Sequence, residues 1–349
     1  MSDTSGSQTN ITDGQQVQLL ERVTGAVVTT LPCCVFLFIN VTMLFTLRSK
    51  PVFCETSRYV LLYNLLFADT VQMALGHLLY LISASRLILT YPVCGFLILL
   101  ASLTTTISPL TLLVMSLERY VAVCYPLRHT TIITIRNTGV AIFVIWALGS
   151  LNILTRVLLL LEFPFKDLEN LQMKDFCSGV YIFLGPRSKD YDRAFICVLF
   201  VSAGVAISFS YFGVIIAARS ASTDKASARK ARNTLLLHLV QLCLILSTTM
   251  FTSLFMALSG ILTRIVFVRV YILLYIFISL FPRCLCSLIY GIRDQTIRPV
   301  LMHHLCCGWK TPSTTQAPMT SRLYVTDRPS LFHYGRYSPL PNCIRSLTP

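Results

Sequence analysis

Charged residues are scarce in this chain of 349 residues. They make up 13% of it and hydrophobic residues 54%, whereas soluble domains average about 25% charged residues. Catalytic motifs are also absent: we find no His-Glu-x-x-His helix, no glycine loop that cradles phosphate and no nucleophile elbow. His303, His304, Cys306 and Cys307 lack the spaced pairs of a zinc site. The sequence therefore argues against a soluble domain, an enzyme and a metal centre, and it implies no cofactor.

Long uncharged segments dominate the chain instead. Seven of them approach or exceed the roughly 20 residues that a helix needs to cross a bilayer. Only two carry a charge, Asp69 in the second and Arg283 in the seventh. Backbone groups in lipid must be satisfied internally, and runs this long do not suit barrel strands. We therefore expect an all-α membrane protein, a seven-helix bundle with spans at 24–47, 59–85, 87–117, 137–155, 194–218, 233–263 and 270–292.

The basic residues predict the orientation of this bundle, since cytoplasmic loops carry an excess of Lys and Arg. We count the terminal segments and loops alternately along the chain. The set that contains the N-terminal segment holds ten Lys/Arg and nine Asp/Glu, and the set that contains the C-terminal tail holds eighteen Lys/Arg and five Asp/Glu. The basic set includes the C-terminal tail and is expected in the cytoplasm, so the N-terminus lies outside. Topology thus explains the net charge of +14 without any nucleic acid, and the inner face should attract anionic lipid.

The chain then divides into four parts. We expect an extracellular tail, a seven-helix domain, a juxtamembrane amphipathic helix and a disordered cytoplasmic tail rich in Ser, Thr and Pro, at 1–23, 24–292, 293–307 and 308–349. Asn10 begins a glycosylation sequon in the first part. Cys306 and Cys307 close the third part, where adjacent cysteines are typical of palmitoylation. The alternative is a pair of unmodified thiols.

An acid–base pair, Glu118-Arg119, follows the uncharged third segment. Charges at the end of a membrane helix are costly to remove from water and are usually functional. The carboxylate can shield its neighbour, which suggests a switch in which Arg119 is held and then released. The alternative, of equal weight on spacing alone, is an interfacial pair whose side chains reach the lipid headgroups.

The residues after this pair resemble a known family. Arg119-Tyr120, followed by Cys-Tyr-Pro-Leu-Arg-His at 124–129, resembles the inner end of the third helix in odorant receptors, which are rhodopsin-like G-protein-coupled receptors. The Leu-Leu-Phe-Ala-Asp run that ends at Asp69 and the Lys-Ala…Thr…His-Leu pattern at 230–239 extend the resemblance. It covers roughly residues 40–307 and looks like a divergent, fish-type branch.

The resemblance implies a multi-pass plasma-membrane receptor that acts in olfaction. A small molecule would bind from outside and activate a heterotrimeric G protein at the inner face, with arrestin as a further partner of the tail. The residues to which it gives switch or coupling roles are Glu118, Arg119, Tyr120, Tyr211 and Tyr290. Two alternatives stay open. One is a rhodopsin-like receptor for a non-odorant ligand, and the other is a ligand-gated channel or transporter, although the chain lacks inverted repeats.

Polar residues inside the spans carry further expectations. By analogy with the family, Asn40, Asp69 and Ser108 would form a buried site for sodium or a proton; the alternative for Asp69 is a protonated structural carboxyl. Arg283 should face the bundle interior or water rather than lipid. The usual Asn-Pro of the seventh helix is replaced by Cys286-Ser287. Prolines cause kinks, and their positions in this chain differ from those of common receptors in the family. We therefore expect its helices to bend differently from theirs, with the third helix interrupted at Pro109.

Two cysteines, Cys94 and Cys177, clearly fall on the outer side, where thiols oxidise. A bridge between them would pin the long outer loop over the mouth of the bundle, and it matches a hallmark disulfide of the receptor class. The 25 residues from Cys94 to Arg119 span about 37 Å of helix, so the two residues should lie at opposite faces of the membrane.

A ligand would bind between the helices, near their outer half. Ala101 stands at the level where amine receptors hold a carboxylate, so small, weakly polar odorants suit the site better than charged amines. For each candidate, the alternative is packing between helices by small side chains. The candidates lie on the second, third and sixth helices and are His77, Ala101, Ser102, Thr105, Thr106, Thr252, Ser253 and Met256.

Overall fold

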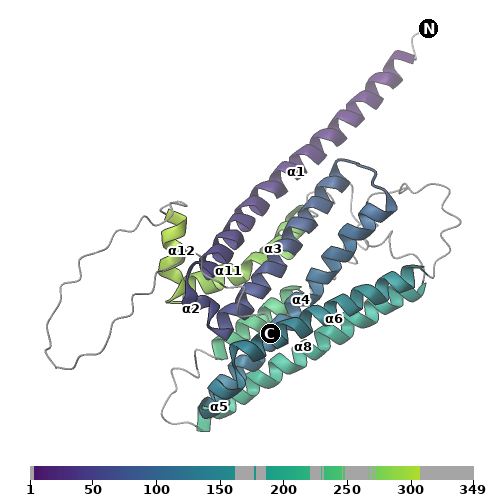
Figure 1. Cartoon of the computed structure of the whole chain (residues 1–349). Helices are drawn as coiled ribbons and strands as arrows, with labels where there is room; N and C mark the ends of the chain where they lie inside the picture. Colours follow the sequence, from purple (N-terminus) through teal and green to yellow (C-terminus); the bar gives the residue numbers. More distant parts are fainter. Residues whose placement is uncertain are drawn as a thin grey trace, which may run out of the picture.

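The computed structural model describes residues 4–161, 177, 186–220, 229, 232–245, 247, 266, 270 and 272–306. Every element within these residues is a helix, and the longest helices lie side by side as a bundle (Figure 1). The elements are α1 (Thr4–Ser49), α2 (Pro51–Cys54), α3 (Ser57–Ala84), α4 (Tyr91–Cys124), α5 (Pro126–Ile132), α6 (Ile135–Leu161), α8 (Pro186–Ser220), η2 (Tyr275–Leu280), α11 (Phe281–Arg293) and α12 (Ile297–Cys306).

Five helices are long and apolar enough to cross a membrane. They overlap the first five expected spans and cover Arg22–Ser49, Ser57–Ala84, Tyr91–Cys124, Ile135–Leu161 and Asp190–Ala217. The described parts of the other two expected spans form shorter apolar helices, Arg232–Ile245 and Ile272–Leu285. The predicted all-helical membrane class is confirmed.

The third span differs from the sequence expectation at both ends and at Pro109, and α4 ends at Cys124 rather than at Leu117. α4 begins at Tyr91 rather than at Leu87, because Arg86 adopts a left-handed turn conformation and Pro92 fits the first turn of a helix, where no N–H donor is needed. Pro109 lies inside an unbroken α4, so the expected interruption is wrong. Prolines are tolerated in membrane helices because neighbouring groups satisfy the carbonyl that proline leaves free.

The seventh span contains a wide turn just before a proline. η2 is a π-helix that runs directly into α11, and Pro282 is the second residue of α11. Proline has no N–H to donate, and its ring crowds the carbonyl four residues earlier. A π-turn relieves that crowding by shifting the hydrogen-bond ladder by one residue. The position of Pro282 therefore explains where this helix widens.

Large apolar side chains fill the interior and also cover the outside. Leu62, Leu65 and Leu112 are fully buried in the main core, to which α1, α3, α4, α8, α11 and α12 contribute side chains. In contrast, Phe143 is 72% exposed and Phe209 is 65% exposed on the outer surfaces of α6 and α8. Water-facing surfaces rarely carry such extensive apolar area, whereas lipid-facing surfaces require it.

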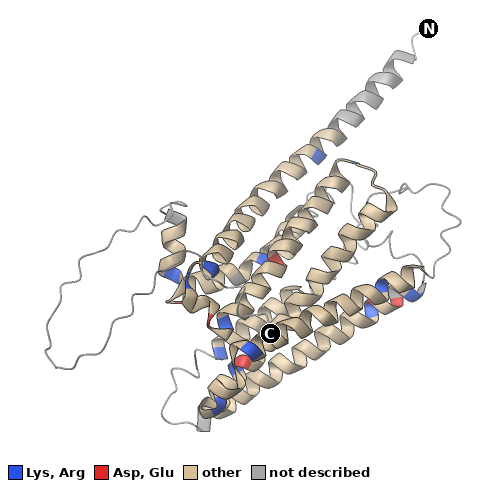
Figure 2. Ribbon diagram, viewed as in Figure 1, with Lys and Arg blue, Asp and Glu red and all other residues tan. Residues whose placement is uncertain are grey.

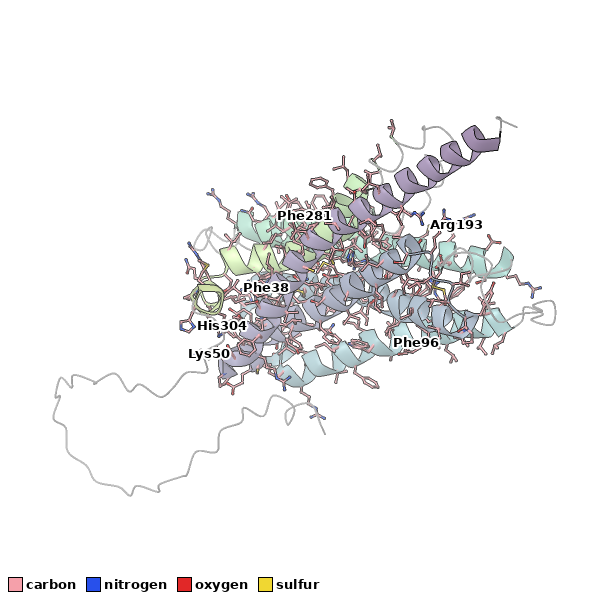
Figure 3. The ribbon with its side chains drawn as sticks, turned by 90° about the horizontal axis from the view of Figure 1, so that it is seen from above. Phe38, Lys50, Phe96, Arg193, Phe281 and His304 are labelled. Carbon is pink, nitrogen blue, oxygen red and sulfur yellow. A yellow bond between two sulfur atoms is a disulfide. The ribbon has the colours of Figure 1, made fainter. Side chains whose placement is uncertain are left out.

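Charged residues gather near the two ends of the bundle and leave long uncharged stretches between them (Figure 2). Lys50 and His304 lie at one end, and Phe96 and Arg193 lie toward the other (Figure 3). We call the first the Arg119 end, because α4 finishes there, and the second the disulfide end, because α4 starts there with Cys94.

α12 packs beside the last turns of α1 at the Arg119 end. Thr46 Oγ1 lies 3.0 Å from His304 Nδ1, and the His304 ring meets Phe45 edge-on with ring centres 5.0 Å apart. Partial burial lowers the pKa of His304 below its usual value, and the nearby His303 and Lys50 lower it further. The docked helix therefore favours the neutral imidazole.

Candidate functional site

The acid–base pair of α4 lies at the Arg119 end of the bundle. Arg119 Nε lies 3.3 Å from Glu118 Oε2, and the two side chains are 16% and 8% exposed. His129 of α5 approaches the same carboxylate, with 4.0 Å from Nε2 to Glu118 Oε1. Arg119 Nε and Nη2 have no hydrogen-bond partner among the described residues. The guanidinium is thus shielded by charge while much of its donor capacity stays unused.

The neighbouring Tyr120 packs against α8. Its ring centre lies 5.9 Å from that of Phe209 and 6.0 Å from that of Tyr125. A Cβ at Gly213 would come within 2.3 Å of the Tyr120 ring, so α8 can approach α4 here only because residue 213 is glycine. Tyr120 therefore serves as a packing contact between the third and fifth spans.

The other two expected switch residues, Tyr211 and Tyr290, have different kinds of contact. Tyr211 packs beside Val214 and Leu235, and no described hydrogen bond joins it to Arg119. Tyr290 is buried, and its hydroxyl lies 3.0 Å from Nε2 of His238 on the sixth span. The sequence motif that contains His238 was recognised, but this link between the sixth and seventh spans was not foreseen.

A second charged pair at the Arg119 end joins α3 to the α11–α12 junction. Arg58 Nη2 lies 3.1 Å from Asp294 Oδ2, and the guanidinium carbon lies 5.4 Å from the centre of the Tyr290 ring. Asp294 also accepts the backbone N–H groups of Thr296 and Ile297 and so caps α12. The sequence analysis did not predict this pair, for which the opposite charges of Arg58 and Asp294 beside two helix ends were the available signal.

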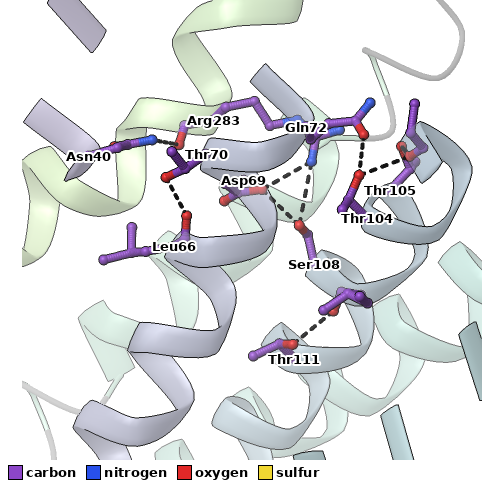
Figure 4. A network of polar contacts seen from close by, with 12 residues as sticks. Asn40, Leu66, Asp69, Thr70, Gln72, Thr104, Thr105, Ser108, Thr111 and Arg283 are labelled. Atoms are coloured by element: carbon purple, nitrogen blue, oxygen red, sulfur yellow. Dashed lines mark hydrogen bonds and ion pairs between the residues drawn. The ribbon is translucent and has the colours of Figure 1, made fainter. Parts of the chain in front are cut away.

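The expected buried polar residues come together at mid-bundle (Figure 4). Ser108 Oγ donates to Asp69 Oδ1 at 2.7 Å, and Arg283 Nη1 lies 3.0 Å from the same oxygen. Asn40 Nδ2 donates to the backbone carbonyl of Arg283, and Ser287 Oγ donates to Asn40 Oδ1. Arg283 therefore faces the bundle interior, and it supplies the cation beside Asp69.

A further buried polar link was missed by sequence reasoning. Trp146 of α6 donates from Nε1 to Asn64 Oδ1 at 2.9 Å. Asn64 in turn donates to Thr111 Oγ1 at 2.9 Å. This chain ties α6, α3 and α4 together, and a lone Trp in an apolar run gives no sequence signal for such a partner.

The candidate ligand residues divide between two places. His77 Nε2 lies 3.0 Å from Thr30 Oγ1 on α1, and its ring stacks with those of Tyr80 and Tyr275. On α4, Ala101, Ser102 and Thr105 are half-buried, and Thr106 is buried. Thr252, Ser253 and Met256 lie outside the described residues. The structure thus gives His77 partners on α1 and η2, apart from the hydroxyl cluster of α4.

Thr106 also connects to a charged pair that sequence reasoning did not foresee. Asn152 of α6 lies 3.4 Å from Thr106 Oγ1 and accepts a hydrogen bond from Tyr191. Arg156, one helical turn further along α6, pairs with Asp192 of α8. These contacts join the fourth and fifth spans at the disulfide end.

The remaining expected sites are placed only in part. Cys94 and Cys177 form a disulfide, which fixes residue 177 to the first turn of α4. Asn10 and Cys306 lie in helical backbone, in α1 and α12, and their side chains are outside the described set. Cys307 lies outside the described residues. Glycosylation and palmitoylation therefore stay predictions.

Comparisons with known proteins agree on one family. The model of the 7 transmembrane receptor (rhodopsin family) matches residues 39–290. The chain is 30% identical to Odorant receptor 131-2 of Danio rerio over 78% of this chain and 83% of that protein. It is 28% identical to Olfactory receptor 1078 of Rattus norvegicus and 32% identical to Olfactory receptor 7A17 of Homo sapiens. These two matches cover 36% and 33% of this chain and 38% of each relative.

Proposed function

Because the chain belongs to the rhodopsin family of seven-transmembrane receptors, we propose that it is an odorant receptor that activates a heterotrimeric G protein. Members of this family are receptors and not enzymes. One observation carries the proposal: the Glu118–Arg119 pair stands at the end of α4, in a sequence similar over most of its length to an odorant receptor.

The proposal includes a topology. Seven spans cross the plasma membrane with the N-terminus outside, because the basic loops belong in the cytoplasm. α12 lies along the inner surface, held by palmitoyl groups on Cys306 and Cys307, while Asn10 carries a glycan outside. The tail beyond residue 307 offers hydroxyl groups for phosphorylation and for recruiting arrestin.

The switch follows from the contacts at the Arg119 end. A ligand that binds one state of the bundle more tightly shifts the population toward that state. The sixth span is held to the seventh by His238 and Tyr290, so an outward movement of the sixth span breaks this hydrogen bond. Release of Arg119 from Glu118 then exposes a guanidinium to the incoming G protein. Tyr211 on α8 becomes a partner of Arg119 only after such a movement.

The ligand site is proposed at the disulfide end, beside the half-buried hydroxyl groups of α4. Ala101 leaves no carboxylate there to bind an amine, which favours small, weakly polar molecules. Thr105 gives the sharpest test because, within the described part of the chain, its hydroxyl donates to the carbonyl of Ala101 in its own helix and not to another helix. Thr105→Ala should weaken the response to a subset of ligands by about tenfold, as loss of one hydrogen bond predicts. Unchanged responses to every ligand would remove Thr105 from the site.

The function itself is tested by measuring cAMP in cells that express this chain with an olfactory-type G protein, against a panel of small odorants. A dose-dependent rise that is absent from mock-transfected cells is expected. Silence despite verified surface expression would contradict the odorant assignment and leave a non-odorant ligand or another G protein to be tried. A ligand-driven current without cAMP would replace the receptor proposal with a channel.

Arg119→Ala tests the switch in the same cells. The variant should reach the surface normally and lose G-protein activation by more than about tenfold, the usual scale of coupling between two sites. Arg136→Ala is the matched control, because it removes one exposed positive charge from the first turn of α6 at the same end of the bundle. A normal response in Arg119→Ala would contradict the proposed role.

A further inference from the structure

An ion pair between Asp69 and Arg283 lies at the centre of the bundle. Asp69 is 0% exposed and Arg283 is 3% exposed. The residues are 214 positions apart in the sequence and belong to α3 and α11. They are also the two charged residues in the seven predicted spans, which are otherwise uncharged. The pair therefore needs a physical reason for its presence.

Neither charge is stable here without the other. Taking a single ion out of water costs several kcal/mol even after relaxation, and an intramembrane charge is retained only where it meets a partner or water. The carboxylate of Asp69 and the guanidinium of Arg283 satisfy that condition for each other, with 3.0 Å between Oδ1 and Nη1. Removing the Arg283 side chain leaves the negative charge of Asp69 buried without a partner, and removing the Asp69 side chain leaves the positive charge of Arg283.

Side-chain oxygen atoms of two residues lie close to Arg283 Nη1. Asp69 Oδ1 lies 3.0 Å away and Ser108 Oγ lies 3.4 Å away, and the hydroxyl also donates to the carboxylate (Figure 4). Carboxylate and hydroxyl oxygens are the ligands that hard cations prefer. Asp69 Oδ2 is buried and has no hydrogen-bond partner among the described residues. The carboxylate thus keeps an unused acceptor on its second oxygen.

The backbone that carries Arg283 is itself fixed. Asn40 of α1 donates to the Arg283 carbonyl at 3.2 Å, and Ser287, one turn later in α11, donates to Asn40 Oδ1 at 2.5 Å. All of these side chains are buried. Arg283 is therefore held from its main chain as well as from its guanidinium, and the cation cannot leave the site as a free ion would.

We propose that Arg283 is the resident cation of the Asp69–Ser108 site, a tethered guanidinium in the place where a mobile sodium ion would otherwise bind. Two consequences follow. The stability of the wild-type protein does not depend on sodium, because the site is filled by the chain itself. Removal of the guanidinium opens a site that small cations, including free guanidinium, can enter and stabilise.

The test measures the Tm of the full-length protein in nanodiscs by thermal unfolding. Each sample is measured in sodium chloride and in choline chloride at equal ionic strength, because choline is too large for the site. Wild type should show the same Tm in both salts. Arg283→Ala should unfold at a lower temperature in choline. Sodium or millimolar guanidinium should raise that Tm by about 3 °C or more, through binding to the folded state alone.

Two further variants keep the proposal falsifiable if Arg283→Ala is hard to produce. Arg283→Lys retains a tethered cation and should stay insensitive to sodium. Asp69→Asn with Arg283→Met removes both charges, and it should have a higher Tm than either single variant, again without any effect of sodium. A saturable sodium effect on wild type would overturn the proposal. It would also be overturned if Arg283→Ala ignored both cations, or if the double variant were no more stable than the singles.

This inference does not rest on the odorant assignment. Its readout is thermal unfolding, which needs no ligand and no G protein. A silent receptor in the cAMP assay would therefore leave the cation result unchanged, and a failed cation test would leave the signalling proposal unchanged.

Discussion

Two pairs of a carboxylate and an arginine differ in burial and in the elements that they join. Asp69 and Arg283 come from distant helices, and both are almost completely buried. Glu118 and Arg119 are sequence neighbours at a helix end, where Arg119 keeps 16% of its side chain exposed. The first pair connects two elements, whereas the second connects a residue to its own neighbour. A pair that spans elements stabilises their packing, and a pair between neighbours shields a charge that can later be used.

The hydrogen bonds around the two pairs also differ. Near Asp69, each hydrogen-bonding group of Ser108 and Asn40 has a partner on another residue. Near Glu118, Arg119 Nε and Nη2 lack hydrogen bonds within the described part of the chain. Asp69 Oδ2 also lacks a partner among the described residues, but the mid-bundle contacts join α1, α3, α4 and α11. Polar networks between elements rigidify a core, so we place the fixed centre at mid-bundle and the movable part at the Arg119 end. Four variants test this division.

The largest loss is expected from Asp69→Asn. The amide keeps the shape of the side chain but leaves the Arg283 charge buried without a counter-ion. Breaking a buried pair in this way costs about 3 to 5 kcal/mol of folding free energy. Surface expression and the Tm in nanodiscs should both fall sharply. A variant as stable as wild type would show that the pair contributes nothing to the fold.

Loss of the disulfide should come next. Cys94→Ser removes a covalent link between α4 and residue 177, 83 positions away in the sequence, and disulfides contribute about 2 to 4 kcal/mol. Like the buried pair, it joins separate parts, so Tm and surface expression should drop. Cys34→Ser is the control, because Cys34 is an exposed free cysteine. Equal behaviour of the two variants would place the stabilising contacts elsewhere.

Glu118→Gln should act on signalling rather than on stability. The Glu118–Arg119 pair joins two neighbours of one helix rather than two elements, so the Tm should change little. The shield of Arg119 is lost, and cAMP without any ligand should rise above the wild-type level. A clear fall in Tm with unchanged basal cAMP would make this pair structural and would remove the contrast with Asp69.

The smallest effect concerns α12. Because the pKa of His304 is lowered in the docked helix, the undocked helix binds a proton more readily, so docking weakens as the pH falls below the usual 6.5. Hydrogen exchange of the α12 amides in nanodiscs, corrected for intrinsic rates, should be faster at about pH 5.5 than at about pH 7.5. His304→Phe keeps the ring beside Phe45 but cannot titrate, so its exchange should not respond. Equal responses of the two proteins would exclude His304 as the cause.

The first five spans were predicted well because charge is the strongest signal in a membrane chain. The segments around Asp69 and before Arg119 were located from their lack of charge, and Cys94 and Cys177 were matched because both were expected on the outer side. The start of α4 was misplaced, since the run from Leu87 is apolar and gives no warning that Arg86 turns the chain. The π-turn before Pro282 was not specified either, because proline predicts a disturbance but not its form.

Pairings between distant residues were harder to predict than the elements. Asp69 and Arg283 were each singled out, and equal numbers of opposite charges in otherwise uncharged spans were the available clue. Their contact still depends on how α3 and α11 face each other, which periodicity does not fix. The link between His238 and Tyr290 and that between Arg58 and Asp294 depend in the same way on helix rotation at the Arg119 end.

One measurement tests this division most directly: agonist-driven cAMP per surface receptor, for wild type, Arg119→Ala and Asp69→Asn in parallel. We expect Arg119→Ala to have a normal amount of surface receptor and almost no cAMP, whereas Asp69→Asn should lose mainly surface receptor. Normal signalling per receptor in Arg119→Ala, or wild-type surface levels of Asp69→Asn, would contradict this division.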